Sequence, residues 1–208
     1  MTTPAAAAKF WPHLAAGVAP AVDHAMGQIL PEAELLRLFV GIALPPELKL
    51  ALSRLAGGLP GARWVDPGNY HVTLRFIGEV DEGVASDVDA ALAGVRAKRF
   101  ALTLAGVGSF NARNLFVGVE RNPDLAHLQE KVESAIARSG IEPENRRFAP
   151  HVTLARLKGK PDAKLGHYLA EHALFRGAPF DVAQFQLVAS YLTKSGSIYE
   201  DQAEYALA

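Results

Sequence analysis

Apolar positions follow two alternating patterns along this chain from residue 37 onward. Residues 37–44, RLFVGIAL, are an apolar run that ends at two prolines, which is typical of a buried strand. In the next segment Leu48, Leu52 and Leu55 recur at helical spacing before a pair of glycines, which predicts a helix. The same patterns predict strands at 37–44, 62–65, 70–78, 100–110, 114–120, 146–157, 180–193 and 198–207, and helices at 46–58, 81–95, 123–140 and 162–174.

The order of these elements predicts the fold class. Strands and helices are mixed without the strict alternation that builds a doubly wound parallel sheet, so we expect an α+β fold with two largely antiparallel sheets. The second half of the chain repeats the theme of the first. We therefore expect a bilobal, pseudo-two-fold molecule whose two sheets line a central cleft, with the helices outside.

The first 36 residues differ from the rest. They are rich in Ala and Pro and lack the basic start and strongly apolar stretch of a secretory signal. We interpret 1–36 as an N-terminal extension, loosely ordered or with a short amphipathic helix at 21–36, and 37–208 as the functional domain. His13 and His24 are not expected to build a site, because loose termini seldom do.

Composition limits the function further. The 208 residues are half hydrophobic, enough for one substantial core, and the formal net charge of −1 argues against long nonspecific contacts with nucleic acid. A local basic patch for a small or short anionic ligand remains possible. The absence of cysteine excludes disulfides, thiolate metal sites and a cysteine nucleophile. No apolar run is long enough to span a bilayer, so we expect a cytoplasmic protein without a membrane partner. No long exposed apolar helix indicates an obligate partner chain, so we expect a monomer.

The tetrapeptide HVTL occurs twice, at His71 and again 80 positions later at His151. In a strand, side chains alternate between faces, so the Val and Leu of each copy point into the core. His71 and Thr73, like His151 and Thr153, then point outward side by side. Two such strands related by an approximate two-fold would bring two imidazoles and two hydroxyls around one cavity.

This set of side chains suits phosphoester chemistry. One neutral histidine can take a proton from an attacking hydroxyl or water, and the other, protonated, can give one to the departing oxygen. Threonine hydroxyls can donate hydrogen bonds to phosphoryl oxygens as their charge grows. Histidine titrates near neutral pH and needs little adjustment for either role. We expect no metal and no cofactor.

Other interpretations stay open at this point. A two-histidine metal site is one of them, although no acidic residue or third histidine lies at ligand spacing. A Ser-His-Asp hydrolase would need a G-x-S-x-G turn, which is absent, as are the phosphate loop and the dinucleotide fingerprint. A non-catalytic module that binds RNA ends or nucleotides on the same fold is the alternative from another class.

The chain resembles the 2H phosphoesterases, and within them the bacterial RNA 2′,3′-cyclic phosphodiesterases, also called 2′-5′ RNA ligases. The resemblance spans about 37–207 and rests on RLFVGIALP, LPGARWVDPGNYHVTLRFIGEV, RRFAPHVTLARL and the spacing of Ser190, Gly196 and Tyr199. The N-terminal extension departs from the usual pattern of the family.

The resemblance implies hydrolysis of 2′,3′-cyclic phosphate at RNA 3′ ends, or on short oligonucleotides, to a 2′-phosphate, with reversible 2′-5′ ligation in vitro. It implies that His71 is the proton donor and His151 the proton acceptor, with Thr73 and Thr153 beside them.

The fifth residue after each motif histidine is Phe76 in one copy and Arg156 in the other. An aromatic ring and a guanidinium facing each other could hold a nucleobase, and the family associates these positions with nucleotide contact. Strict alternation places both on the core side, so this role requires a strand end or a bulge before them. Other basic residues are expected to be solvated or to add positive potential, and the remaining histidines to be exposed or structural: Arg63, Arg75, Arg146, Arg147 and Lys158; His127, His167 and His172.

Overall fold

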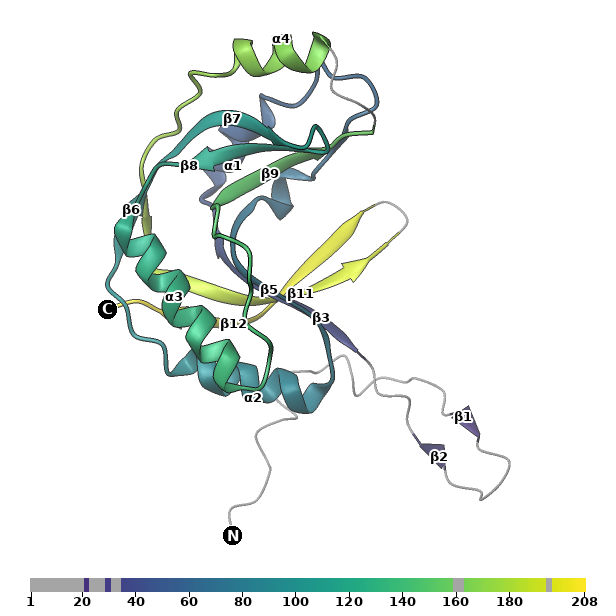
Figure 1. The fold of residues 1–208 in the computed structure, drawn as a ribbon, viewed down its shortest axis with the longest axis vertical. Helices are drawn as coiled ribbons and strands as arrows, with labels where there is room; N and C mark the ends of the chain where they lie inside the picture. Colours follow the sequence, from purple (N-terminus) through teal and green to yellow (C-terminus); the bar gives the residue numbers. More distant parts are fainter. Residues whose placement is uncertain (1–20, 23–28, 31–34, 159–162, 194–195) are drawn as a thin grey trace.

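Two four-stranded antiparallel sheets form the body of the protein (Figure 1). The computed structural model describes residues 21–22, 29–30, 35–158, 163–193 and 196–208. The first sheet has the strand order β12-β11-β3-β5, and the second has the order β4-β9-β8-β7. The strands are β3 (Leu36–Ala43), β4 (Arg63–Trp64), β5 (His71–Val80), β7 (Leu104–Phe110), β8 (Asn114–Val119), β9 (His151–Arg156), β11 (Gln184–Leu192) and β12 (Ser197–Ala206).

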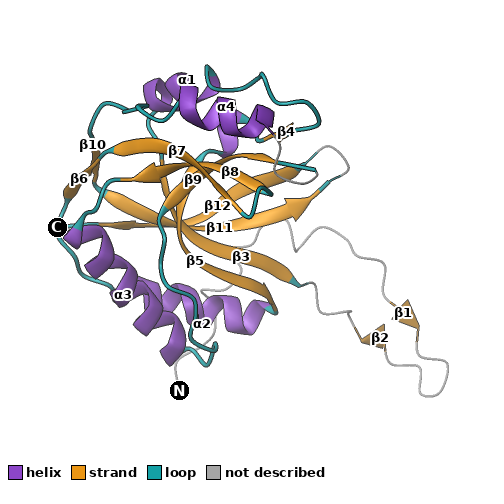
Figure 2. Cartoon of the chain, turned by 45° about the horizontal axis from the view of Figure 1, so that its top comes forward, coloured by secondary structure: helices purple, strands orange, loops and turns teal. Residues whose placement is uncertain are grey.

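Two helices cover the first sheet and two lie beside the second (Figure 2). Asp81 and Asn122 start α2 and α3, because each side chain accepts a hydrogen bond from a backbone N–H of the first turn. No helix within the described ranges is long and apolar enough to cross a membrane. The helices are α1 (Pro46–Ser53), α2 (Glu82–Ala93), α3 (Pro123–Arg138) and α4 (Ala163–Glu171), with a 3₁₀ turn at Pro67–Asn69.

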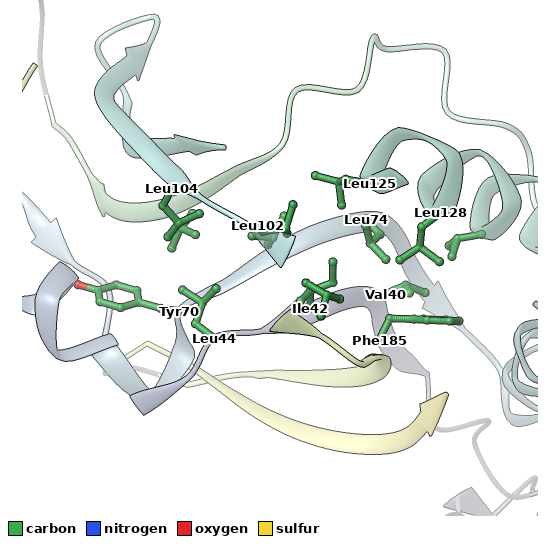
Figure 3. Close-up of a cluster of buried hydrophobic side chains, with 14 of the residues drawn as sticks. Val40, Ile42, Leu44, Tyr70, Leu74, Leu102, Leu104, Leu125, Leu128 and Phe185 are labelled. Atoms are coloured by element: carbon green, nitrogen blue, oxygen red, sulfur yellow. The ribbon is translucent and has the colours of Figure 1, made fainter. Parts of the chain in front are cut away.

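A continuous cluster of buried side chains joins the sheets and helices into one domain. Val40, Ile42 and Leu74 of the first sheet meet Leu125 and Leu128 of α3 in this cluster (Figure 3). These residues supply the apolar positions of strand and helix patterns that the sequence predicts. The α+β fold with antiparallel sheets is therefore confirmed.

The two lobes, each built on one four-stranded sheet, do not correspond to the two halves of the sequence. The last two strands of the chain, β11 and β12, complete the first sheet, while β4 and β7 from the first half belong to the second sheet. Each lobe thus takes strands from both halves, which ties the two copies of HVTL into one folded unit.

Some predicted boundaries were wrong. The predicted strands at 100–110 and 180–193 each divide in two, because β6 (Phe100–Leu102) and β10 (Phe180–Val182) pair with each other in a separate two-stranded sheet. The strand predicted from residue 146 begins at His151.

The helix predicted at 21–36 is also wrong for the residues described there. Ala21–Val22 (β1) pairs antiparallel with Ile29–Leu30 (β2). His13 and His24 lie outside the described residues.

Candidate active site

The two HVTL copies occupy equivalent strands of the two sheets. β5 pairs antiparallel with β3, and β9 pairs antiparallel with β8. Over their first six residues, HVTLRF and HVTLAR, the two strands share one burial pattern: part-buried and buried in alternation up to Leu, then buried, then exposed. The prediction that His and Thr share the face opposite Val and Leu is confirmed.

An identical irregularity follows each motif. In β5, Thr73 pairs with Gly41 and Arg75 with Val40, so Leu74 is an extra residue. In β9, Leu154 is the extra residue between the pairs made by Thr153 and Ala155. Such a bulge shifts the alternation by one residue. Phe76 and Arg156 therefore return to the face of the motif histidines, and both are exposed.

The two imidazoles are held in the same way. His71 Nδ1 lies 2.8 Å from the carbonyl oxygen of Asn69, and His151 Nδ1 lies 2.8 Å from that of Ala149. A carbonyl can only accept, so Nδ1 carries the proton in both rings and Nε2 is the unprotonated nitrogen of the neutral ring. β5 and β9 lie against each other, and the charge of His151 acts on His71.

His71 stands in an aromatic pocket of the first sheet. Its ring stacks on Phe39 with the centroids 4.6 Å apart and meets the edge of Tyr199 at 5.2 Å. Gly41 leaves room for this stack, because a Cβ there would lie 3.3 Å from Phe39 and 3.4 Å from His71. Thr73 Oγ1 is 3.0 Å from His71 Nε2.

This packing affects the charge of His71. Burial lowers its pKa below the usual value, and the nearby positive charges of His151 and Lys49 lower it further, while the Asn69 carbonyl opposes them. His71 is part-buried, so it keeps some contact with solvent although surrounding atoms enclose most of the side chain. In the free protein near neutral pH, His71 is therefore neutral.

His151 has a different aromatic support. Its ring meets Phe110 at 5.0 Å and Phe116 at 5.4 Å, both edge to face, and these two phenylalanines stack on each other. Gly108 makes this possible, since a Cβ at that position would collide with the Phe116 ring. No motif or spacing in the sequence points to Phe39, Phe110 or Phe116 as neighbours of the histidines.

The exposed residues after the bulges have distinct neighbours. Phe76 lies under the guanidinium of Arg37, 5.0 Å from the ring centroid. Arg156 is directly across from Asn114 of β8 on one side and from Arg63 of β4 on the other. Residues paired in this way share a face of the sheet, so all three side chains stand on the face of His151.

The other predicted basic residues are divided between structural and surface positions. Arg75 is not a solvated cation: it is only 8% exposed, and its Nε lies 2.8 Å from Glu133 Oε2, although the two groups are not aligned as a hydrogen bond. Arg146 forms an exposed ion pair with Glu144. Arg63, Arg147 and Lys158 are exposed.

The remaining histidines lie where they were expected. His127 and His167 are exposed, and His172 packs edge-on against Tyr168. Among the residues that the structure describes, no three His, Asp or Glu side chains are grouped so that they could hold a metal ion. Hollows of about 410 and 470 Å³ lie beside α2 and α3, away from the motif histidines.

The amino-acid sequence is similar to those of known phosphoesterases. A family model described as LigT like Phosphoesterase matches twice, at residues 42–116 and 117–199. An RNA 2′,3′-cyclic phosphodiesterase of Aeropyrum pernix is 38% identical over 149 residues, 69% of this chain and 84% of that protein. One of Thermotoga maritima is 33% identical over 79% of this chain and 92% of that protein.

Solved structures agree. E. coli LigT complexed with 3′-AMP has a TM-score of 0.72 and 28% identity, over 84% of this chain and 99% of that one. A Thermus thermophilus protein, TT0787, has a TM-score of 0.68 and 25% identity, over 82% of this chain and 97% of that one. Each of the two matched ranges contains one copy of HVTL, and the chain belongs to the LigT-like phosphoesterase family.

Proposed function

We propose that this protein hydrolyses the 2′,3′-cyclic phosphate at RNA 3′ ends to a 2′-phosphate, without a metal or cofactor. One observation carries the proposal: two histidines on equivalent strands each fix Nδ1 on the carbonyl two residues before, which leaves two Nε2 atoms for proton transfer. The names of the relatives from Aeropyrum pernix and Thermotoga maritima support the same substrate.

In the proposed reaction, water attacks the phosphorus in line with the 3′ oxygen. His151 Nε2 takes the proton of the water as the new P–O bond forms. His71 Nε2 gives its proton to the 3′ oxygen as the P–O3′ bond breaks, which leaves a 3′ hydroxyl and a 2′-phosphate. Thr73 and Thr153 donate hydrogen bonds to the phosphoryl oxygens, on which negative charge grows.

The assignment of His71 as proton donor requires a suitable pKa. A proton donor must be protonated when the substrate is bound, whereas burial and positive neighbours lower its pKa in the free protein. The negative charge of a bound phosphate acts in the opposite direction and raises the pKa. Substrate binding would therefore favour protonation of His71, which later gives this proton to the 3′ oxygen.

The first experiment measures the turnover of a nucleoside 2′,3′-cyclic phosphate in EDTA, with products separated by chromatography. Wild-type protein should yield only the 2′-phosphate. His71→Ala and His151→Ala should each lower kcat by about 10²- to 10⁴-fold, because each removes one proton transfer. His167→Ala, an exposed histidine on α4, is the control and should retain full activity.

A substrate with sulfur in place of the bridging 3′ oxygen assigns the two roles. A thiolate leaves without a proton donor, so this substrate should restore turnover to His71→Ala but not to His151→Ala. The reverse result would exchange the roles. Full activity in both variants would refute the proposal, and tight binding of a 2′-phosphate without hydrolysis would favour the non-catalytic module.

We also propose that the enzyme acts on RNA 3′ ends and short oligonucleotides as a cytoplasmic monomer. Light scattering of the purified full chain should give the mass of one chain, about 22.2 kDa. Cell fractionation should find the protein in the cytosolic fraction. A dimer mass, or recovery outside that fraction, would overturn the corresponding part.

A further inference from the structure

The two sheets carry opposite charge. The strands of the second sheet, β4, β7, β8 and β9, contain Arg63 and Arg156 and no acidic residue. The first sheet contains Arg37 and Arg75 against four acidic residues, Glu79, Glu200, Asp201 and Glu204. A polyanion that reaches the two histidines would therefore lie along the second sheet.

The positive charge of that sheet is concentrated at one end. Arg63 lies directly across from Arg156, and two more cations flank the pair. Arg113 belongs to the turn between β7 and β8, and Lys158 follows β9 by two residues. Leu157 N donates to the Arg113 carbonyl at 2.7 Å, which ties the turn to the end of β9. We call Arg63, Arg113, Arg156 and Lys158 the arginine–lysine cluster.

Within the described part of the chain, these cations have no carboxylate partner. All four are exposed. Like charges directly opposite each other in a sheet destabilise it. Other arginines of the protein do have carboxylates, as in the pairs of Arg75 with Glu133 and Arg176 with Glu120. An external polyanion bound on this face would neutralise the cluster.

The distance along β9 indicates which anion. At about 3.3 Å per residue, the five steps from His151 to Arg156 span about 16 Å of strand. The phosphate that reacts between the histidines is too far away to neutralise the whole cluster. A ligand that also neutralises the cluster carries a second phosphate, which an RNA strand has and a nucleoside 2′,3′-cyclic monophosphate does not.

We propose that the arginine–lysine cluster binds the internucleotide phosphate that precedes the reacting 3′ end, so that the enzyme prefers oligoribonucleotides to mononucleotides. This inference rests on the proposed function. It extends the site beyond Arg156 to Arg63, Arg113 and Lys158. The nucleobase contact of Phe76 and the phosphate contact of the cluster would then lie on opposite lobes.

The test compares two diribonucleotides that end in a 2′,3′-cyclic phosphate. One has the normal charged linkage, and the other has a neutral methylphosphonate linkage. For the wild-type protein, kcat/KM should be about tenfold higher for the charged substrate. Arg63→Gln and Arg113→Gln should each reduce this ratio severalfold, and the double variant should bring it close to one. In the double variant, the dependence of kcat/KM on salt concentration should weaken by about the contribution of one phosphate contact.

Arg138→Gln, on the exposed surface of α3, is the matched control and should keep the wild-type ratio. A ratio near one in the wild type, or an unchanged ratio in both single variants, would overturn the inference. If the wild type turns over neither substrate, the proposed function fails instead. Binding of the two dinucleotides to His151→Ala, measured by calorimetry, then still tests the cluster, because it should favour the charged linkage and lose that preference with Arg63→Gln.

Discussion

Leu74 and Leu154 are equivalent residues of the two lobes, because each is the extra residue of a β-bulge directly after a motif threonine. In each strand the bulge turns two consecutive residues into the core and returns the next one to the face of the histidines. That next residue is Phe76 in β5 and Arg156 in β9. The duplicated bulge thus places one aromatic ring and one guanidinium on the same face of their strands as the motif histidines.

The first prediction concerns Phe76. If its ring stacks on the nucleobase, Phe76→Ala should lower kcat/KM for an RNA dinucleotide about 5- to 150-fold, since stacking contributes about 1–3 kcal/mol per base. Stability should change little, because the side chain is 42% exposed. Steady-state kinetics and thermal unfolding measure the two effects. Leu174→Ala, at a residue 95% exposed outside the site, is the control. A large loss of stability with unchanged kinetics would make Phe76 a core residue.

The second prediction concerns Gly41. A methyl group there would lie 3.2 Å from the Val72 carbonyl oxygen and within 3.4 Å of the Phe39 and His71 rings. Gly41→Ala should therefore displace the His71 ring and lower kcat about tenfold or more, while the protein stays folded. The matched control is Gly166→Ala in α4, where a methyl group meets no neighbour. That change should keep kcat and stabilise the helix by up to about 1 kcal/mol. Equal activity of the two variants would contradict the crowding argument.

The third prediction concerns the ion pair behind the site. Arg75 Nε lies 2.8 Å from Glu133 Oε2 of α3, and its terminal nitrogen donates to the Glu142 carbonyl at 2.5 Å. This carbonyl belongs to the segment that leads from α3 to His151. Arg75→Met leaves Glu133 without its partner, which should lower the free energy of unfolding by about 2–4 kcal/mol. The value lies below the range for a fully buried pair because Glu133 is 20% exposed.

Urea denaturation of four proteins checks this prediction: wild type, Arg75→Met, Glu133→Leu and the double variant. Removing both charges should cost less than the sum of the single changes, because no uncompensated charge then remains. Additive effects would show that the two side chains act independently. The equivalent position of the β9 bulge holds Ala155, which is fully buried.

Much of the site follows from local pattern alone. Alternation within a six-residue strand is enough to put His71 and Thr73 on one face and Val72 on the other, and the structure confirms it. The bulge does not follow from the pattern. It depends on how β5 pairs with β3, and β9 with β8, and a single strand carries no record of its neighbour's register.

The aromatic neighbours of the histidines show the same limit. Phe39 of β3 and Tyr199 of β12 lie far apart in the sequence, while Phe110 and Phe116 come from the consecutive strands β7 and β8. Sequence spacing cannot specify that these strands meet at two imidazoles. Division of the predicted strand at 100–110 has a similar cause, because β6 leaves the second sheet to pair with β10.

The last prediction is the effect of His71 on stability at low pH. Burial lowers its pKa in the folded protein below the unfolded value of about 6.5. Above that pH the ring is neutral in both states and contributes nothing to the pH dependence. As the pH falls below about 6.5, the unfolded chain binds a proton that the folded protein does not, so stability decreases until the folded pKa is reached. His71→Gln removes this difference and should lose less stability than the wild type between pH 7.5 and pH 5.5.

Urea denaturation at both pH values measures the effect. Asp201 also titrates in this protein, because burial and Glu204 raise its pKa, and its contribution has the opposite sign: stability increases as the pH falls through the raised value. That contribution is common to the wild type and the variant and cancels in their difference. His167→Gln, which changes an exposed ring, should follow the wild type. If His71→Gln loses as much stability as the wild type on acidification, the fold does not hold His71 neutral. Substrate binding is then not needed to protonate this histidine.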